Sequence, residues 1–257
     1  MGTITKALEM LDYFSRARPQ IGLGEFVRLT GRDKATVHRH LTELAANGFL
    51  EQDPASRAYR LGPAVLRLSG VREATIPVRS VVRPIVTRLA REVGELAHFS
   101  LLQERRLSPV FHFDPCLHGT RVAFDESEML PLHATSSGLA VLAFAPAEFS
   151  EAVLAGPLAP ITAHTLTDPG RLRVLLDDVR ARGIARLDQS FDEEVSSQGA
   201  PIFDATGAVT GALSVAVPVV RATAAKCTPI RDALTRAAEE ITAALGGNAR
   251  PLTKAHA

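Results

Sequence analysis

The sequence of 257 residues predicts an α+β fold in two parts, a small helical N-terminal part followed by a larger part with a mainly antiparallel sheet. The first observation behind this prediction is a pair of short helical segments joined by a glycine-containing turn and followed by a short hairpin. The second is the alternation of long amphipathic helices with consecutive strand pairs beyond residue 78. The third is the composition, because 46% hydrophobic and 22% charged residues exclude disordered, collagen and coiled-coil chains.

The N-terminal part contains three predicted helices. Apolar residues recur at helical spacing over residues 3–14, and a stretch that ends at Gly22 breaks this first helix. A second helix is predicted over 23–30 and is closed by Gly31, and a third begins after Asp33, whose carboxylate can cap its first turn. Two short helices joined by such a turn are typical of a helix-turn-helix motif.

A hairpin is predicted directly after the third helix, which ends at Asn47-Gly48. Residues 49–52 are predicted as its first strand, residues 53–56 as the turn and residues 58–61 as the returning strand. In this position the hairpin would be the wing of a winged helix-turn-helix.

The chain length corresponds to one large domain or two smaller ones, at roughly 150 residues each. We expect a winged helix-turn-helix over residues 1–68, a linker helix over 69–79 and a second domain over 80–257. Residues 1–79 hold 12 Lys/Arg against 8 Asp/Glu, a net charge of +4, and the remainder holds 17 against 20, a net charge of −3. A basic N-terminal part indicates attraction to a polyanion, because phosphate binding depends on where the charge lies.

The second part opens with an amphipathic helix over 78–93 whose arginines face solvent, and Gly94 ends it. The further predicted elements are strands over 96–102 and 107–113, helices over 136–144 and 169–182, a strand over 184–187, a hairpin of 200–204 with 209–217, and a closing helix over 230–245. This order of helices and strand pairs favours an antiparallel sheet covered by helices.

Several classes of protein are excluded or disfavoured. The N-terminus does not read as a secretory signal, and no run reaches the roughly 18 apolar residues of a membrane span. Cys116 and Cys227 are the only cysteines and lack zinc-site spacing, and they suit a reducing cytoplasm. A loose group of side chains matches no familiar metal site, so we expect no metal and, because no phosphate-binding glycine loop occurs, no nucleotide cofactor. That group is His98, His112, Cys116, His118 and His133.

The third helix carries candidate DNA contacts. If Val37 faces inward, the polar side chains of this helix lie over an exposed arc, where a recognition helix presents donors to bases and phosphates. They are Lys34, Thr36, His38, Arg39 and His40. Alone, the segment is better explained as a solvated helix face, but the preceding helix, turn and following hairpin reverse that preference. Candidate backbone or minor-groove contacts in the hairpin are Arg57, Tyr59 and Arg60.

A second group of polar residues precedes the helix over 136–144. Backbone N–H groups at this helix start, together with Thr135, Ser136 and Ser137, could hold a carboxylate. The simpler alternative is that Thr135 or Ser136 caps the helix. The acidic run over 192–194 is most simply a solvated loop, although it could shape a pocket mouth and would then repel an anionic ligand.

A serine hydrolase is a further alternative, because His133, Ser136 or Ser137, and Asp188 could form a triad. The sequence has no Gly-x-Ser-x-Gly elbow, and no strong strand leads directly into the two serines. The hydrolase interpretation is therefore disfavoured, and we expect no enzyme.

With these residues assembled, the chain resembles the isocitrate-lyase regulator (IclR) family of transcription regulators over roughly residues 3–246. The matching segments are Ala7-Leu-Glu-Met-Leu11, Lys34-Ala-Thr-Val-His-Arg-His-Leu41, Tyr59-Arg-Leu-Gly62, Pro131-Leu-His-Ala-Thr135 with Gly138, Ala140-Val-Leu-Ala-Phe144, Ala200-Pro-Ile-Phe-Asp204 and Gly211-Ala-Leu-Ser-Val215. The segments are specific only in combination.

The resemblance implies a winged helix, a linker helix and a GAF-like domain that binds a small metabolite, usually a carboxylate or aromatic acid. It also implies a homodimer or homotetramer on double-stranded operator DNA, with the sign of regulation left open. The effector residues it implies are His133, Ser136, Ser137, Asp188, Ser197 and Ser214. Family members commonly carry Gly-Val-Arg-Cys where this chain has Glu194-Val-Ser-Ser197, so the effector's identity does not transfer. A metabolite-binding module without specific DNA binding remains an alternative.

Overall fold

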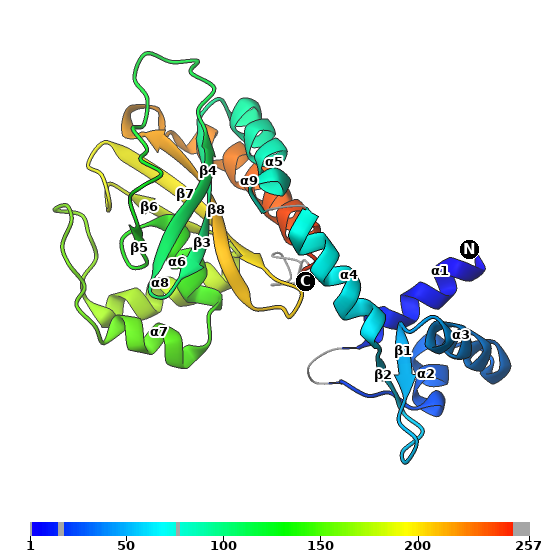
Figure 1. The fold of residues 1–257 in the computed structure, drawn as a ribbon. Coiled ribbons are helices and arrows are strands. Elements are labelled where there is room, and N and C mark those ends of the chain that lie inside the picture. Colours follow the sequence, from blue (N-terminus) through cyan, green and yellow to red (C-terminus); the bar gives the residue numbers. More distant parts are fainter. Residues whose placement is uncertain (1, 15–17, 76–77, 249–257) are drawn as a thin grey trace. The chain divides into compact units, whose positions relative to one another are not determined.

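The computed structural model describes residues 2–14, 18–75 and 78–248 of the chain (Figure 1). The chain divides into two units, Met1–Pro77 and Val78–Ala257. Each unit has its own hydrophobic core.

The N-terminal unit is a helix-turn-helix followed by a hairpin and a further helix. Its elements are α1 (Thr3–Leu8), the 3₁₀ helix η1 (Glu9–Tyr13), α2 (Leu23–Thr30), α3 (Lys34–Ala46), β1 (Leu50–Gln52), β2 (Tyr59–Leu61) and α4 (Pro63–Thr75). The predicted single helix over 3–14 is thus an α-helix that tightens into a 3₁₀ turn, as is frequent at helix C-termini. The strands β1 and β2 pair antiparallel, with Glu51 opposite Arg60.

Local signals explain where α2 and α3 end and begin. Gly31 closes α2 in the left-handed region, at φ +65°, which favours glycine. Asp33 then caps α3, since its Oδ1 accepts a hydrogen bond from the Thr36 amide at 2.9 Å. Phe26 and Leu41 are fully buried in the core that joins these two helices to the hairpin. The predicted helix-turn-helix with a hairpin is therefore confirmed.

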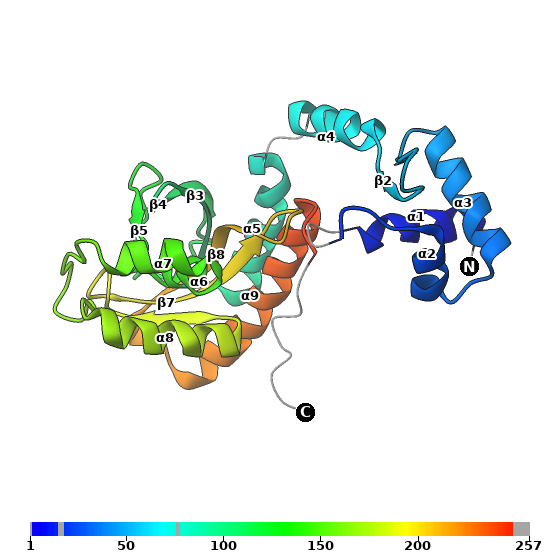
Figure 2. The same cartoon turned by 90° about the horizontal axis from the view of Figure 1, so that it is seen from below.

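The C-terminal unit is a six-stranded antiparallel sheet in the order β5-β4-β3-β8-β7-β6, with helices on both faces (Figures 1 and 2). Its elements are α5 (Val78–Val93), β3 (Leu96–Gln103), β4 (Arg106–Phe113), β5 (Leu130–Pro131), α6 (Ser136–Phe144), α7 (Ala147–Leu154), α8 (Pro169–Arg182), β6 (Ala185–Asp188), β7 (Val195–Phe203), β8 (Val209–Pro218), the 3₁₀ helix η2 (Val219–Arg221) and α9 (Ala224–Ala244). The α+β prediction is confirmed.

Two hydrophobic clusters lie on opposite faces of the sheet. One packs α5 and α9 on the face that carries Phe99 and Leu213. The other packs α6 and α8 on the face that carries Ala212 and, beyond a bulge, Phe203. Because side chains alternate between the faces of a strand, His98 and Ser214 point to the α6 side, between apolar neighbours that point to the α5 side.

Four elements of this unit differ clearly from the prediction. The strand β7 begins at Val195 rather than at residue 200, because it pairs with β6 and β8 over its hydroxyl-rich start. The helix α9 begins at Ala224 rather than at residue 230, and it therefore includes Pro229 in its second turn, where proline removes one backbone hydrogen bond. The elements α7 and β5 were not predicted.

A buried carboxylate ties both ends of this unit together. Glu95 follows α5, is 4% exposed, and receives a two-pronged ion pair from Arg221 at 2.9 and 2.8 Å and another from Lys226 of α9. Burial by itself would raise the pKa of Glu95, but hydrogen bonds from Arg221 and Lys226 outweigh it and hold the pKa below its usual value. The end of α5 and the start of α9 are therefore linked through one charge.

Among the residues that the structure describes, no helix is long and apolar enough to cross a membrane.

Candidate functional site

The first half of α3 presents cationic and polar side chains to solvent. Lys34, His38 and Arg39 are exposed, and Thr36 is half-buried with its amide held by Asp33. A guanidinium such as that of Arg39 can bind two acceptors of a guanine edge, and an ammonium such as that of Lys34 suits a phosphate. This arrangement is suited to a DNA groove, and contact of these residues with DNA stays a prediction.

His40 lies in the core and not on the exposed arc, so the prediction that it faces outward is wrong. Its side chain is 3% exposed, because residues three and four positions apart share a helix face and His40 follows the buried Val37 by three. Neither ring nitrogen has a hydrogen-bond partner within the described structure. Burial, followed by the nearby charges of Arg39, Arg32 and Lys6, lowers the pKa of His40.

The hairpin divides its predicted contacts between core and surface. Tyr59 is 3% exposed and its ring lies edge-on to Phe26, with 6.5 Å between ring centroids, so its side chain is not available to DNA. Arg60, the next residue along the strand, points to the opposite side and is exposed, with its Nε 2.6 Å from Glu51 Oε1. Arg57 is exposed in the turn, in the left-handed region at φ +59°.

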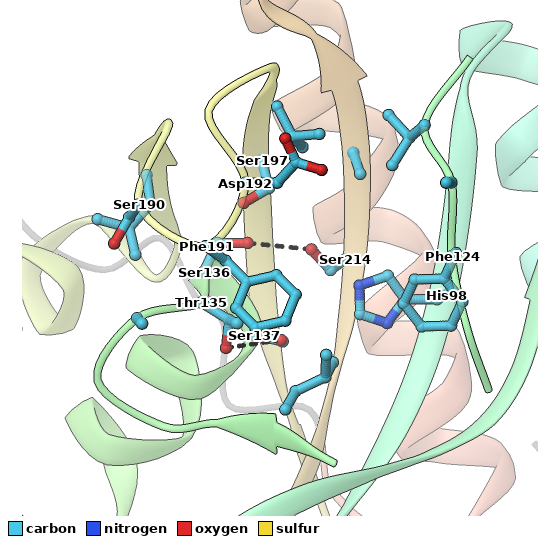
Figure 3. A pocket seen from close by; sticks show the side chains of 17 residues that line it. His98, Phe124, Thr135, Ser136, Ser137, Ser190, Phe191, Asp192, Ser197 and Ser214 are labelled. Carbon is cyan, nitrogen blue, oxygen red and sulfur yellow. Dashed lines mark hydrogen bonds between the residues drawn. The ribbon is translucent and has the colours of Figure 1, made fainter. Parts of the chain in front are cut away.

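The C-terminal unit contains a cavity of about 80 Å³ on the α6 side of the sheet (Figure 3). The start of α6, strands β3, β7 and β8, and two loops form its walls. The lining residues are His98, Val122, Ala123, Phe124, Leu130, Ala134, Thr135, Ser136, Ser137, Leu187, Ser190, Phe191, Asp192, Val195, Ser197, Ser214 and Ala216.

A cap and a close backbone contact place the start of α6 in this wall. Thr135 is the N-cap, because its Oγ1 accepts from the Gly138 amide at 3.0 Å, so the expectation of a capping residue here is confirmed. The peptide that joins Ser136 and Ser137 packs on Gly199 of β7, where a Cβ atom would lie 2.6 Å from the Ser136 carbonyl carbon. Only glycine at position 199 allows this approach.

Four of the six predicted effector residues line the cavity. Ser136 Oγ lies 3.0 Å from Ser214 Oγ, and Ser214 Oγ donates to the Gln198 carbonyl at 2.8 Å (Figure 3). Ser137 Oγ donates to Thr135 Oγ1 at 3.3 Å. The fourth residue, Ser197, lies on the adjacent strand β7 and faces the same cavity.

The other two predicted effector residues, His133 and Asp188, are not among the lining residues. The Nε2 of His133 lies 3.0 Å from the Ala159 carbonyl oxygen, and Asp188 accepts from Ser196 Oγ. Asp188 pairs with Ser196 across β6 and β7, so strand alternation directs it to the other face of the sheet, while Leu187 faces the cavity. The structure therefore does not bring His133 and Asp188 to the cavity serines, as a hydrolytic triad would require.

His98 is a cavity residue that the sequence placed only in a loose group of side chains without metal-site spacing. Its ring stacks on Phe124 with 4.5 Å between ring centroids, and its Nδ1 lies 3.3 Å from Ser100 Oγ. Burial lowers the pKa of His98 to about 3, with a smaller contribution from His112, so the ring is neutral at pH 7. A usable signal was the alternation of polar His98 and Ser100 with apolar Ala97 and Phe99 along the predicted strand.

Three further lining residues, Ser190, Phe191 and Asp192, come from the loop between β6 and β7 and were not predicted to bind. Ser190 Oγ is buried and has no hydrogen-bond partner within the described structure, a costly state that a bound ligand could relieve. The Asp192 carboxylate lies in the same wall, so the expectation that the acidic run could shape a pocket mouth fits its position.

A series of contacts leads from the cavity to the first turn of α5. Phe124 in the cavity wall lies 5.2 Å from the His112 ring, and His112 Nδ1 lies 2.9 Å from Glu126 Oε1. Glu126 Oε2 in turn lies 3.4 Å from Arg79 Nη2, on the second residue of α5. Burial would raise the pKa of Glu126, but the hydrogen bond from His112 and the charge of Arg79 outweigh it and lower the pKa.

Among the residues that the structure describes, no group of three or more His, Cys, Asp or Glu side chains could hold a metal ion.

Each of the two parts of the chain matches a known domain family. Residues 3–54 match the IclR helix-turn-helix domain, and residues 74–243 match the bacterial transcriptional regulator IclR C-terminal domain. The glycerol operon regulatory protein of Streptomyces griseus is 34% identical over 220 residues, 85% of each chain.

Two solved structures are informative for the fold. An IclR transcriptional regulator of Silicibacter sp. TM1040 is 42% identical, with a TM-score of 0.89 over 99% of this chain and 100% of the other. An IclR homologue of Microbacterium hydrocarbonoxydans, solved as a complex with 4-hydroxybenzoate, is 26% identical, with a TM-score of 0.60 over 95% of this chain and 99% of the other.

Proposed function

The chain belongs to the IclR family of DNA-binding transcriptional regulators with an effector-binding C-terminal domain, and on this premise we propose which of its own residues carry the two activities. The N-terminal unit binds a specific double-stranded operator. The cavity of the C-terminal unit binds a small organic effector that changes the affinity for that operator. The family resemblance of the whole chain and the cavity with its serines support this assignment.

On the DNA side, we propose that Arg39 reads a base edge while Lys34, Thr36 and His38 hold phosphates or neighbouring bases. Arg57 and Arg60 contact the DNA backbone from the hairpin. His40 and Tyr59 shape the unit from inside without touching DNA, because both side chains are buried.

We further propose a division of the chain into a winged helix over residues 1–68, a linker over 69–79 and an effector domain over 80–257. The protein acts in the cytoplasm as a homodimer or homotetramer, because a pair of recognition helices can then occupy half-sites about one DNA turn, or a multiple of it, apart. An effector with unequal affinity for two arrangements of such an assembly shifts the population between them.

On the effector side, the observation that carries the proposal is the convergence of Ser136, Ser137, Ser197 and Ser214 on one cavity together with the unpartnered Ser190 hydroxyl. The solved relative in complex with 4-hydroxybenzoate supports a small organic molecule as the kind of ligand. An acid was expected from the helix start and the family resemblance. His133 and Asp188 support the walls from behind.

The proposal is tested by fluorescence anisotropy of the purified protein on DNA from upstream of its own gene and on a scrambled sequence, at several salt concentrations. We expect the protein to bind the native DNA much more tightly than the scrambled sequence. We also expect small organic molecules to weaken or strengthen its binding to the native DNA. Equal and steeply salt-dependent binding to both DNAs would mean that the protein binds this upstream DNA only through attraction to its phosphates. Absence of DNA binding, with ligands present, would favour a metabolite-binding module instead.

A further inference from the structure

The loop between β6 and β7 brings Ser190 to the cavity wall. Resting on the proposed function and its acid effector, we propose that Ser190 is a specificity-determining residue. Its hydroxyl forms a hydrogen bond with a second, uncharged polar group that the effector carries besides its carboxylate. Thr162 and Thr165, from the loop between α7 and α8, are the residues that position Ser190.

The Ser190 hydroxyl is buried and lacks a hydrogen-bond partner. The residue is 3% exposed, and its Oγ contacts no donor or acceptor within the described structure. A buried polar group in this state is costly, and most such groups in native proteins are paired. The only other buried side chain with unpartnered polar atoms among the described residues is His40, in the core of the other unit. Because Ser190 lines a cavity, a ligand in that cavity can supply the missing partner.

The backbone before Ser190 is fixed in an uncommon conformation. Gln189 lies in the left-handed region at φ +58°, which few residues other than glycine adopt. Its amide donates to the Val195 carbonyl at 2.8 Å, and its Nε2 donates to the Glu193 carbonyl at 2.8 Å. Conformations that the surrounding contacts impose in this way are found most often at functional sites.

Two threonines hold the carbonyl groups on either side of the Gln189–Ser190 peptide. Thr162 Oγ1 donates to the Gln189 carbonyl at 2.6 Å, and Thr165 Oγ1 donates to the Ser190 carbonyl at 2.6 Å. The threonines are also joined to each other, since Thr165 Oγ1 accepts from the Thr162 amide at 2.9 Å. Neither threonine is among the lining residues. Ser190 is therefore held through its backbone, and its hydroxyl stays available to a ligand.

Ser190 meets a different part of a ligand from the part that meets the start of α6. Ser136 and Ser214 contact each other in the middle of the wall, with Ser137 nearby, and Ser190 lies apart from all three (Figure 3). A carboxylate that binds at the start of α6 therefore leaves Ser190 to a second group of the same molecule. A hydroxyl both donates and accepts, so this group can be a hydroxyl, an oxo group or an amide.

The charge and size of the cavity narrow the class of effector. The Asp192 carboxylate also lines the cavity, so a second anionic group is disfavoured by repulsion. At about 80 Å³ the cavity is smaller than the roughly 300–1,000 Å³ pockets that enclose drug-sized ligands, so the two polar groups lie on a short carbon skeleton. Phe124 and Phe191 supply apolar surface for that skeleton. A small acid with one neutral polar substituent meets these conditions, and a dicarboxylic acid does not.

The first test compares acids with and without a second polar group on the full-length protein without DNA. The probes are benzoate, 3-hydroxybenzoate, 4-hydroxybenzoate and terephthalate, and butyrate, 3-hydroxybutyrate, 4-hydroxybutyrate and succinate. Their dissociation constants are measured at pH 7 by ligand-observed NMR. We expect at least one hydroxy acid to bind about fivefold or more tightly than its parent acid, and more tightly than the dicarboxylic acid of its series. A panel in which no hydroxy acid binds more tightly than its parent would overturn the inference.

Ser190→Ala removes the hydroxyl that we assign to the second group. The hydroxy acid and its parent should then bind about equally, and the dissociation constant of the parent should stay within about twofold of wild type. Ser150→Ala is the matched control, because this buried serine donates to the Leu142 carbonyl at 2.7 Å outside the cavity lining, and it should keep the wild-type preference. A preference that survives in Ser190→Ala would contradict the assignment.

The same two variants give a second signature that needs no ligand. Ser190→Ala removes a buried hydroxyl without a partner, whereas Ser150→Ala leaves the Leu142 carbonyl without its donor. In urea unfolding we expect the midpoint of Ser190→Ala to lie at or above that of wild type, and that of Ser150→Ala to lie below it. An equal fall of the midpoint in both variants would show that Ser190 is paired in the free protein, against the inference.

The positioning role of Thr165 is tested with two substitutions of similar size. Thr165→Val removes the hydroxyl and Thr165→Ser keeps it, so the preference for the hydroxy acid should fall several-fold in the first and return in the second. The dissociation constant of the parent acid should change little in either. Thr235→Val is the control, because this α9 hydroxyl donates to the Arg231 carbonyl outside the cavity lining. A wild-type preference in Thr165→Val would remove Thr165 from the assignment.

These measurements use no DNA and therefore separate the two proposals. Absence of operator binding in the anisotropy titration would contradict the proposed function without changing the result for Ser190. Acids that bind with a preference independent of Ser190 would contradict the present inference alone.

Discussion

Adjacent residues on α3 and in the hairpin differ in burial, so that one packs in the core and the next faces solvent. Arg39 is exposed and His40 is buried, and one strand position likewise separates buried Tyr59 from exposed Arg60. The steps of about 100° per helical residue and of one face per strand residue account for both pairs. Removal of an exposed member should therefore alter DNA binding without altering the fold.

Arg39→Ala should weaken operator binding by about 1–3 kcal/mol if Arg39 reads a guanine, and should leave binding to scrambled DNA nearly unchanged. The measurement is the anisotropy titration at one fixed salt concentration. Arg171→Ala, which removes an exposed arginine of the other unit, should behave as wild type on both DNAs. Equal loss on operator and scrambled DNA would make Arg39 a phosphate contact.

His98 should make the stability of the C-terminal unit depend on pH. Its pKa is about 3 in the folded protein and about 6.5 in an unfolded chain, so between these values the unfolded state binds more protons. The free energy of unfolding should fall as the pH drops below about 6.5, by up to about 1.4 kcal/mol per pH unit from this residue. Urea unfolding of wild type and His98→Gln at pH 7, 6 and 5 measures this pH dependence. If the free energy of unfolding fell equally with pH in the two proteins, the prediction would be contradicted.

At the scale of elements, the helices over 78–93, 136–144 and 169–182 are predicted at their observed bounds because their end signals are local. Thr135 caps α6, and Gly183 closes α8 at φ +73°. The start of β7 and the two residues of β5 are not predictable in this way, because pairing with distant strands defines them.

The same division holds for the cavity. Ser136 and Ser137 follow from the helix start, and Ser197 and Ser214 from the family resemblance. Strand alternation indicates only that His98 points away from the apolar side of its strand. The sheet order and a loop conformation, which one-dimensional patterns do not contain, bring His98 and Ser190 to the cavity. Asp188 was misplaced by a single strand position, since one residue along β6 changes the face of the sheet.

The packing of α6 on β7 yields a prediction at this scale. Gly199→Ala places a methyl group 2.6 Å from the Ser136 carbonyl atoms, so helix and strand must separate. We expect a loss of about 1–3 kcal/mol in the free energy of unfolding, together with loss of ligand binding. Gly24→Ala on α2, where a Cβ would meet nothing within 4 Å, is the control and should be neutral or slightly stabilising in urea unfolding.

At the scale of the whole molecule, the contacts from Phe124 through His112 and Glu126 to Arg79 connect the cavity wall to the residue after the start of α5. The N-terminal unit ends at Pro77, one residue before this helix. We therefore propose this series as the element through which a ligand in the cavity influences DNA binding.

Glu126→Gln should weaken the contacts to both His112 and Arg79 while keeping the side-chain shape. Coupling between two sites typically amounts to about 1–3 kcal/mol, and we expect the variant to lose most of it. The operator affinity without effector and the effector affinity without DNA should stay near wild type, and anisotropy titrations with and without effector give the coupling. The control is Glu240→Gln in α9, which removes the ion-pair partner of Arg88, another arginine of α5. This variant should retain full coupling.

The carboxylate at the junction of α5 and β3 also constrains how this protein can change over generations. Loss of Arg221 and Lys226 would leave the buried Glu95 carboxylate unpaired, and an unpaired charge left in a broken buried ion pair costs about 3–5 kcal/mol. Joint replacement of all three by apolar residues is cheap by comparison. In homologous chains we therefore expect residues at these three positions to change together. Evolution would then conserve or replace the link between the end of α5 and the start of α9 as one unit.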